Sequence, residues 1–266
     1  QLLSIYSKGY QLFGDPEYKR VAEQIVSFLM RDMKGANGGF YSALDADSEG
    51  EEGKYYRWRE DELRDLLGSG HELFSDYYGI APDMAWDSEY FVPFRAGSDA
   101  DFARRHQLQP AELEAYKKQW QSQLMKARSQ RVFPGVDDKV ITSWNALLIT
   151  AFADAYDAFG EEVYLGEALE LYGFIRKNGD DNGNLRHSYK PGDVRSLGFL
   201  EDYAYLARAA FRLYQVTGDP MYLEGADKLL SEIRERFPDS DSPFFRFREE
   251  SGLLAEIIKT DDGVMP

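Results

Sequence analysis

The feature that most constrains the fold is a helix–turn–helix layout that occurs three times along the chain. In each copy a stretch rich in Ala, Leu and aromatic residues runs into a glycine, and a tyrosine closes the turn that follows. The three turns read GDPEY, GEEVY and GDPMY, at residues 14–18, 160–164 and 218–222. Because glycine tolerates the left-handed backbone that ends many helices, each turn predicts a helical hairpin.

The expected helices differ in how their apolar residues are distributed. The helix expected from Ser143 onward, with Ser143 as its N-cap, places Phe152 on a wide stripe of leucines and alanines. The helix expected after Leu200 carries a similar stripe, which indicates packing on two sides. The segments 164–177 and 222–236 carry more charge and are predicted to form an outer layer.

This pattern predicts an all-α fold, an (α/α) toroid in which inner and outer helices alternate, with about four to five hairpins present. Strand signals are scarce. Residues 60–133 interrupt the repeat, and we expect them to form a decorated hairpin within a single domain that spans 1–266. Both ends are expected to be cut, because the chain begins inside an amphipathic helix and stops in a turn.

Charge and composition exclude several classes of partner. The net charge of −16 would repel nucleic acids and anionic membrane surfaces. No apolar run reaches the roughly 20 residues that a membrane-spanning helix needs. Cysteine is absent, so disulfides and thiolate chemistry are excluded, and we expect a cytoplasmic location. The oligomeric state is left open.

The loop at residues 38–58 combines acids with aromatic rings, as carbohydrate sites do. Asp45 and Asp47 lie among further glutamates, and Trp58 closes the segment. Carboxylates transfer protons and bind hydroxyls, while flat rings stack on sugar faces. The acidic run also resembles the start of a calcium-binding loop, but Tyr56 stands where a bidentate glutamate is required, so an EF-hand is excluded. A solvated acidic loop is the alternative interpretation.

Topology predicts that the polar connectors share one rim of the toroid. In alternating hairpins, every connector from an outer helix to the next inner helix lies on the same side; these connectors are 35–58, 134–143, 178–199 and 238–252. The candidate catalytic residues on this rim are Asp45, Asp47, Asp138, His187, Glu201 and Asp202. The candidate substrate-binding residues are Tyr41, Trp58, Lys139, Trp144, Asn145, Arg186 and Tyr203.

Several of these residues have a structural interpretation that the sequence leaves open. Glu201 and Asp202 fall where the dipole of a helix N-terminus favours acids. Asp138 belongs to a pair of aspartates that favours turns. His187 could have a structural role, and Trp144 could be a core residue.

Three motifs carry a resemblance to a known family. The segments DADSEGEEGKYYRW (45–58), RSQRVFPGVDDKVITSWNALL (128–148) and GFLEDYAYL (198–206) are similar to the spermatogenesis-associated protein 20 family, which includes the bacterial YyaL-type proteins. The resemblance implies a six-hairpin glycosidase-like toroid, related to N-acylglucosamine 2-epimerases, that follows an N-terminal thioredoxin-like domain absent from this chain. One departure is Ala146, where a glycine is expected, and alanine is the milder residue inside a helix.

Three functions remain open at this stage. The first is a carbohydrate-active enzyme, a glycoside hydrolase in which Asp45 or Asp47 acts with an acid from across the opening. The second is a sugar epimerase or isomerase, which would need a second histidine beside His187. The third is a toroid that binds a sugar or another polyhydroxylated partner without turnover. No motif indicates a cofactor, and apart from a looser cation site that the acidic run leaves open, none indicates a metal site.

Overall fold

The computed structural model describes the chain except for residues 88, 179–183, 191–196, 241–242 and 249–266. The chain divides into two compact units, which are treated separately: unit 1 combines Gln1–Ala43 with Asp137–Pro266, and unit 2 is Leu44–Val136. Parts of the predicted connectors 178–199 and 238–252 therefore lie outside the described residues. Among the described residues, no helix combines the length and the apolar character needed to cross a membrane.

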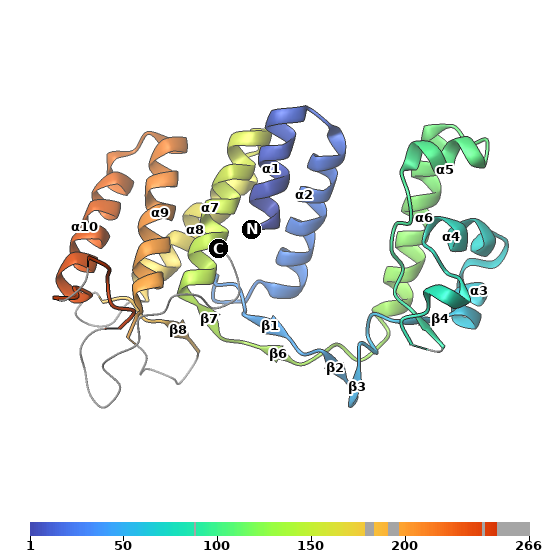
Figure 1. Cartoon of the computed structure of the whole chain (residues 1–266), viewed down its shortest axis with the longest axis horizontal. Coiled ribbons are helices and arrows are strands. Elements are labelled where there is room, and N and C mark those ends of the chain that lie inside the picture. Colours follow the sequence, from blue (N-terminus) through green and yellow to red (C-terminus); the bar gives the residue numbers. More distant parts are fainter. Residues whose placement is uncertain (88, 179–183, 191–196, 241–242, 249–266) are drawn as a thin grey trace. The chain divides into compact units, whose positions relative to one another are not determined.

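Unit 1 consists mainly of three helical hairpins in the part that the structure describes (Figure 1). Their helices are α1 (Leu2–Phe13) with α2 (Pro16–Phe28), α7 (Thr142–Phe159) with α8 (Glu162–Lys177), and α9 (Leu200–Thr217) with α10 (Pro220–Arg236). A short π-helical turn, η1 (Leu29–Met33), extends α2, and the strands β7 (Val140–Ile141) and β8 (Ser188–Tyr189) pair antiparallel. The strands β1 (Ala43–Leu44) and β6 (Val136–Asp137) lie where the chain passes between the units.

The helices alternate between an inner and an outer layer, as predicted. The first helices of the hairpins pack against one another in the order α1, α7, α9. Each second helix, α2, α8 or α10, packs on its own partner. The central helix α7 is accordingly the most enclosed, and Phe152 and Ala155 on its predicted stripe are completely buried. The all-α hairpin architecture of an (α/α) toroid is thus confirmed.

The glycine turns end their helices in the predicted way. Gly14, Gly160 and Gly218 each follow the last residue of an inner helix with φ between 68° and 71°, in the left-handed region. Asp15 and Asp219 then cap α2 and α10, because their side chains accept hydrogen bonds from backbone N–H groups two residues on. A few residues therefore reverse the chain and start the next helix.

Unit 2 has its own hydrophobic core. Its helices are α3 (Glu60–Leu67), α4 (His71–Tyr77), α5 (Asp99–Arg105) and α6 (Pro110–Arg128), with 3₁₀ turns η2 (Gly68–Gly70) and η3 (Pro82–Met84). Two short antiparallel pairs join β2 (Asp47–Ser48) to β3 (Glu51–Glu52) and β4 (Trp58–Arg59) to β5 (Tyr90–Phe91). The core consists of Trp58, Leu63, Leu67, Phe74, Tyr77, Phe102, Ala103, Leu113 and Trp120.

A partly buried ion pair in unit 2 predicts a pH-dependent stability. Lys117 Nζ donates to Asp99 Oδ2 at 2.7 Å, and the Tyr77 hydroxyl donates to Asp99 Oδ1 at 2.6 Å. Burial opposes the charge on Lys117, but the hydrogen bonds to Asp99 and Glu114 raise its pKa above the usual value. Burial, followed by the hydrogen bond to Asp99, also raises the pKa of Tyr77. Both groups therefore hold their protons more tightly in the folded state than in the unfolded state.

We therefore expect the free energy of unfolding to fall as the pH rises from about 10, near the unfolded-state pKa values, through the higher folded-state values. Urea unfolding at pH 8, 10 and 11 measures the effect. In Lys117→Met the alkaline decrease should be smaller than in the wild type. Lys118→Met, which alters the exposed neighbouring lysine, should keep the wild-type slope. Equal slopes in the two variants would contradict this role of Lys117.

Candidate functional site

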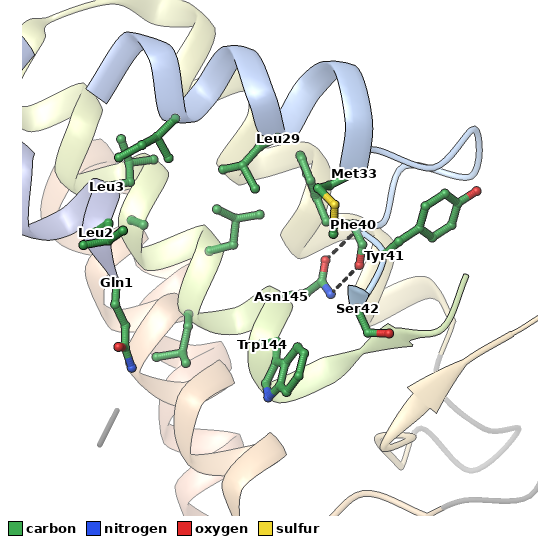
Figure 2. Close-up of a pocket in the computed structure, with 14 residues that line it drawn as sticks. Gln1, Leu2, Leu3, Leu29, Met33, Phe40, Tyr41, Ser42, Trp144 and Asn145 are labelled. Atoms are coloured by element: carbon green, nitrogen blue, oxygen red, sulfur yellow. Dashed lines mark hydrogen bonds between the residues drawn. The ribbon is translucent and has the colours of Figure 1, made fainter. Parts of the chain in front are cut away.

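A cleft of about 450 Å³ opens in unit 1 beside the start of α7 (Figure 2). Helices α1, α2 and α7 form its walls, together with the loop that follows η1. Most of the lining side chains are apolar, and Tyr41, Ser42, Trp144 and Asn145 contribute polar groups. The cleft therefore has the composition of a ligand site, apolar walls with a few polar groups.

Trp144 is the most exposed of the aromatic residues that line this cleft. It lies in the first turn of α7, and 55% of its surface is accessible. Tyr41 also lines the cleft and is half-buried, with its ring extending away from the helices in Figure 2. Of the two interpretations that the sequence left open for Trp144, the structure rules out a core residue and leaves an indole face available to a ligand.

Asn145 fixes the loop that carries Tyr41. Its side-chain oxygen accepts from Phe40 N at 2.9 Å, and its amide nitrogen donates to the Phe40 carbonyl oxygen at 3.0 Å (Figure 2). The same nitrogen also donates to the Ile141 carbonyl oxygen at 2.9 Å. The glycine pair before Phe40 permits this approach, because a Cβ on Gly39 would lie 2.7 Å from the Val140 side chain. Asn145 is buried, and its amide is used by backbone groups, so the structure gives it a positioning role in place of the predicted substrate contact.

Asp202 joins the starts of α7 and α9 to His187. Its side chain is completely buried, with Oδ1 accepting from Ser143 N at 2.9 Å and Oδ2 accepting from Phe199 N at 2.8 Å. His187 Nδ1 lies 3.0 Å from Oδ2, and we assign the proton to Nδ1 because an ionised carboxylate only accepts. Ser143 is therefore not the predicted N-cap: α7 begins at Thr142, and Asp202 binds the free backbone N–H group.

Further predicted residues of unit 1 are Arg186, Glu201, Asp138 and Lys139. The Arg186 carbonyl accepts a hydrogen bond from the Thr142 hydroxyl, which holds the backbone before His187. Glu201 is half-buried in the first turn of α9. Asp138 and Lys139 form ion pairs at a half-exposed turn, with Lys190 at 2.8 Å and Asp137 at 3.0 Å respectively.

Tyr203 is a core residue and offers no surface to a ligand. Only 1% of it is accessible, and its ring contacts Phe237 with the centroids 5.5 Å apart. Its hydroxyl accepts from Leu185 N at 3.2 Å. The predicted substrate contact of Tyr203 therefore does not occur in this structure, because the position faces the inside of the hairpin layer.

The acidic residues of the predicted 38–58 loop belong to unit 2. Asp45 and Asp47 are exposed there, and Asp45 Oδ1 accepts from Asp47 N at 3.0 Å. Glu49 and Gly50, both with positive φ, form the turn of the β2–β3 hairpin. Trp58 is only 3% accessible, and the Arg131 guanidinium lies 4.0 Å from its ring centroid, which leaves no ring face for a sugar. Catalysis by Asp45 or Asp47 stays a prediction.

The sequence reasoning missed the apolar part of the cleft. Leu29, Met33 and Phe40 line its walls, and nothing in their local pattern separates them from ordinary core residues. The only available signal was their position in the chain. Phe40 follows the Gly38–Gly39 pair in the predicted rim connector 35–58, and Leu29 and Met33 precede it.

Comparisons with known sequences agree with the resemblance that the motifs carry. No protein-family model matches the chain. An uncharacterized protein of Caenorhabditis elegans is 30% identical over 299 residues, covering all of this chain and 41% of the relative. Spermatogenesis-associated protein 20 from mouse is 28% identical and that from human 26% identical, again over the whole chain and over 38% and 39% of the relatives. The chain thus spans about two fifths of the length of the curated relatives it matches.

Solved structures with similar architecture are distant. A cellobiose 2-epimerase from Bacillus thermoamylovorans is 14% identical, with a TM-score of 0.40 over 84% of this chain and 55% of that one. An unsaturated glucuronyl hydrolase from Bacillus sp. GL1 is 15% identical, with a TM-score of 0.40 over 94% of this chain and 65% of that one. At this level of similarity neither protein assigns an activity to this chain. The sequence relationship is the stronger one: over its whole length, this chain is similar in sequence to spermatogenesis-associated protein 20 from mouse and human.

Proposed function

We propose that unit 1 carries the sugar site of a carbohydrate-active enzyme of the glycoside hydrolase type, located in the cleft beside Trp144. The observation that carries this proposal is the accessible indole of Trp144 at the mouth of an apolar cleft. Sugar rings present flat C–H faces that stack on indole, and an accessible indole beside an apolar cleft offers such a surface. Tyr41 would supply a second ring and a hydroxyl for hydrogen bonding. The cytoplasmic location remains part of this proposal.

His187 is the residue that we propose to transfer a proton at this site. Asp202 fixes the orientation of the imidazole and stabilises its protonated form, as a buried carboxylate does in other acid–base pairs. The imidazolium would give its proton to the glycosidic oxygen while the bond from that oxygen to the anomeric carbon breaks. Glu201, next to Asp202 in the chain, would take a proton from the attacking water.

Asp202 itself is proposed to position His187, because its oxygens already accept from two backbone N–H groups. A sugar epimerase is a second candidate, favoured by the presence of His187 rather than a pair of open carboxylates. Since His187 is the only histidine in the sequence of unit 1, another residue would have to take the place of the second histidine. Incubation with sugars in deuterium oxide, followed by NMR, distinguishes the two. Deuterium at the carbon next to the carbonyl, without release of a leaving group, would support an epimerase and contradict hydrolysis.

Trp144→Ala tests the sugar site directly. We expect affinity for oligosaccharides to fall about tenfold, since loss of an aromatic stacking surface removes roughly 1–3 kcal/mol in comparable ring contacts. Calorimetric titration with a panel of neutral oligosaccharides and uronides gives the affinities. Trp86→Ala is the matched control, because Trp86 is 50% accessible but belongs to unit 2. Equal affinities for the two variants would contradict this location of the site.

A further inference from the structure

A second cavity, of about 310 Å³, lies between the inner helices of unit 1. It is lined by Gln1, Ser4, Ile5, Lys8, Leu147, Thr150 and Arg208. Gln1 and Leu147 also line the first cleft, so the two cavities are neighbours. Arg208 follows Glu201 by seven residues, about two helical turns, and both therefore lie on the same face of α9. This cavity is thus next to the proposed sugar site and, apart from Gln1 and Leu147, is built from different side chains.

Arg208 is the first unusual feature of this cavity. It is an exposed residue of α9, and within the described part of the chain its guanidinium has neither an ion pair nor a hydrogen bond. The whole chain has 47 acidic and 31 basic residues, so carboxylates that could pair with an arginine are plentiful. A guanidinium that has no carboxylate partner and lines a cavity offers a planar set of hydrogen-bond donors, which matches a carboxylate or a phosphate.

The other charges near the cavity leave a positive excess. Lys8 Nζ lies 3.5 Å from Asp154 Oδ2, and its side chain is 61% accessible. The buried Asp154 is already neutralised by Arg212, whose Nε donates to Oδ1 at 2.8 Å. Arg212 also donates to Asp157 at 2.7 Å. Lys8 and Arg208 are the charged side chains among the residues that line the cavity, and none of those lining residues is acidic, so positive charge prevails there.

A concave site with excess positive charge concentrates anions, and the effect is largest where the rest of the molecule is acidic and excludes them. We propose that the second cavity binds the carboxylate or the phosphate of a small anionic ligand, with Arg208 as the principal contact and Lys8 as a second one. This inference goes beyond the proposed function, which requires only that the first cleft binds a sugar ring. Combined with it, the inference points to acidic sugars as ligands.

Titration calorimetry of the full chain with glucuronate, glucose 6-phosphate, inorganic phosphate and glucose tests the proposal. We expect both anionic sugars to bind at least about tenfold more tightly than glucose, because each charge-assisted hydrogen bond contributes about that factor. Arg208→Gln should remove most of this preference, and Lys8→Gln should remove a smaller part. Arg234→Gln and Lys228→Gln are matched controls, since they make the same changes at exposed positions of α10 and should leave the affinities unchanged.

Each pattern of results has a defined meaning. Preference for glucuronate identifies a carboxylate site, and preference for glucose 6-phosphate together with inorganic phosphate identifies a phosphate site. Binding of anions that depends on Arg208, without any binding of neutral sugars, would support this inference and contradict the sugar site. The inference is overturned if glucose binds as tightly as the anionic sugars, or if Arg208→Gln and Arg234→Gln behave alike.

Discussion

The variant Asp202→Ala should lose about 3–5 kcal/mol of unfolding free energy, because it removes a buried charge that three groups share. The backbone N–H groups of Ser143 and Phe199 would be left without their acceptor, and His187 would lose the carboxylate that orients it. These groups lie at the starts of two neighbouring inner helices, so the damage is concentrated where α7 and α9 meet. Urea unfolding followed by circular dichroism measures the loss.

Glu201→Ala is the matched control for that experiment. It removes a carboxylate from the same helical turn, but one that is half-buried rather than buried. We expect it to cost at most about 1 kcal/mol, the usual contribution of an acid near a helix N-terminus. A loss of less than about 1 kcal/mol in Asp202→Ala would show that the hydrogen bonds of Asp202 contribute little to folding.

His187→Asn should lower turnover of glycosides at least about 100-fold, since a positioned acid–base group usually contributes a factor of that size or more. Asparagine keeps a polar group of similar reach near Asp202 but cannot carry the proton. The expected signature is a loss in kcat with a smaller change in KM, because the residue acts on the bond being broken. A panel of glycosides and unsaturated uronides, with release of reducing sugar as the readout, provides the measurement.

Asp45→Asn accompanies this variant and tests the alternative that the sequence suggested. If hydrolysis depends on Asp45 and survives in His187→Asn, the acidic hairpin of unit 2 supplies the acid and our assignment of His187 is wrong. If the unaltered chain hydrolyses nothing on the panel while calorimetry still detects sugars, the enzymatic part of the proposal fails. The chain would then be a binding protein with a toroidal fold.

The repeated hairpins could be predicted because their signals are local. A glycine at the end of an apolar helix requires only its own backbone conformation, and Gly14, Gly160 and Gly218 adopt it. The alternation of inner and outer helices follows from the width of the apolar stripe on each helix. Both features are readable over about one to three helical turns, a distance at which sequence patterns are reliable.

The roles of individual polar residues could not be predicted, because they depend on partners far along the chain. Asn145 and Trp144 are neighbours in sequence, yet one side chain is enclosed by the loop at Phe40 and the other is exposed. Trp58 and Trp144 were both interpreted as stacking residues, but Trp58 is buried in the core of unit 2 beneath Arg131, whereas Trp144 is exposed. Arg208 and Lys8 could not be singled out from the sequence, because single cations on helices are common. Only the structure shows that these two residues line one cavity.

The hydrogen bonds of Asn145 also have a consequence for how the protein folds. Asn145 and Phe40 are 105 residues apart, with all of unit 2 between them. Forming this contact closes a long loop, and the entropy lost grows with the logarithm of the loop length. This contact joins residues far apart in the sequence, whereas each hairpin closes through a turn of a few residues. We therefore expect the hairpins to form early in folding and the cleft to form late. The proposed sugar site would therefore report completed folding, and a sugar bound there would stabilise the last step of assembly.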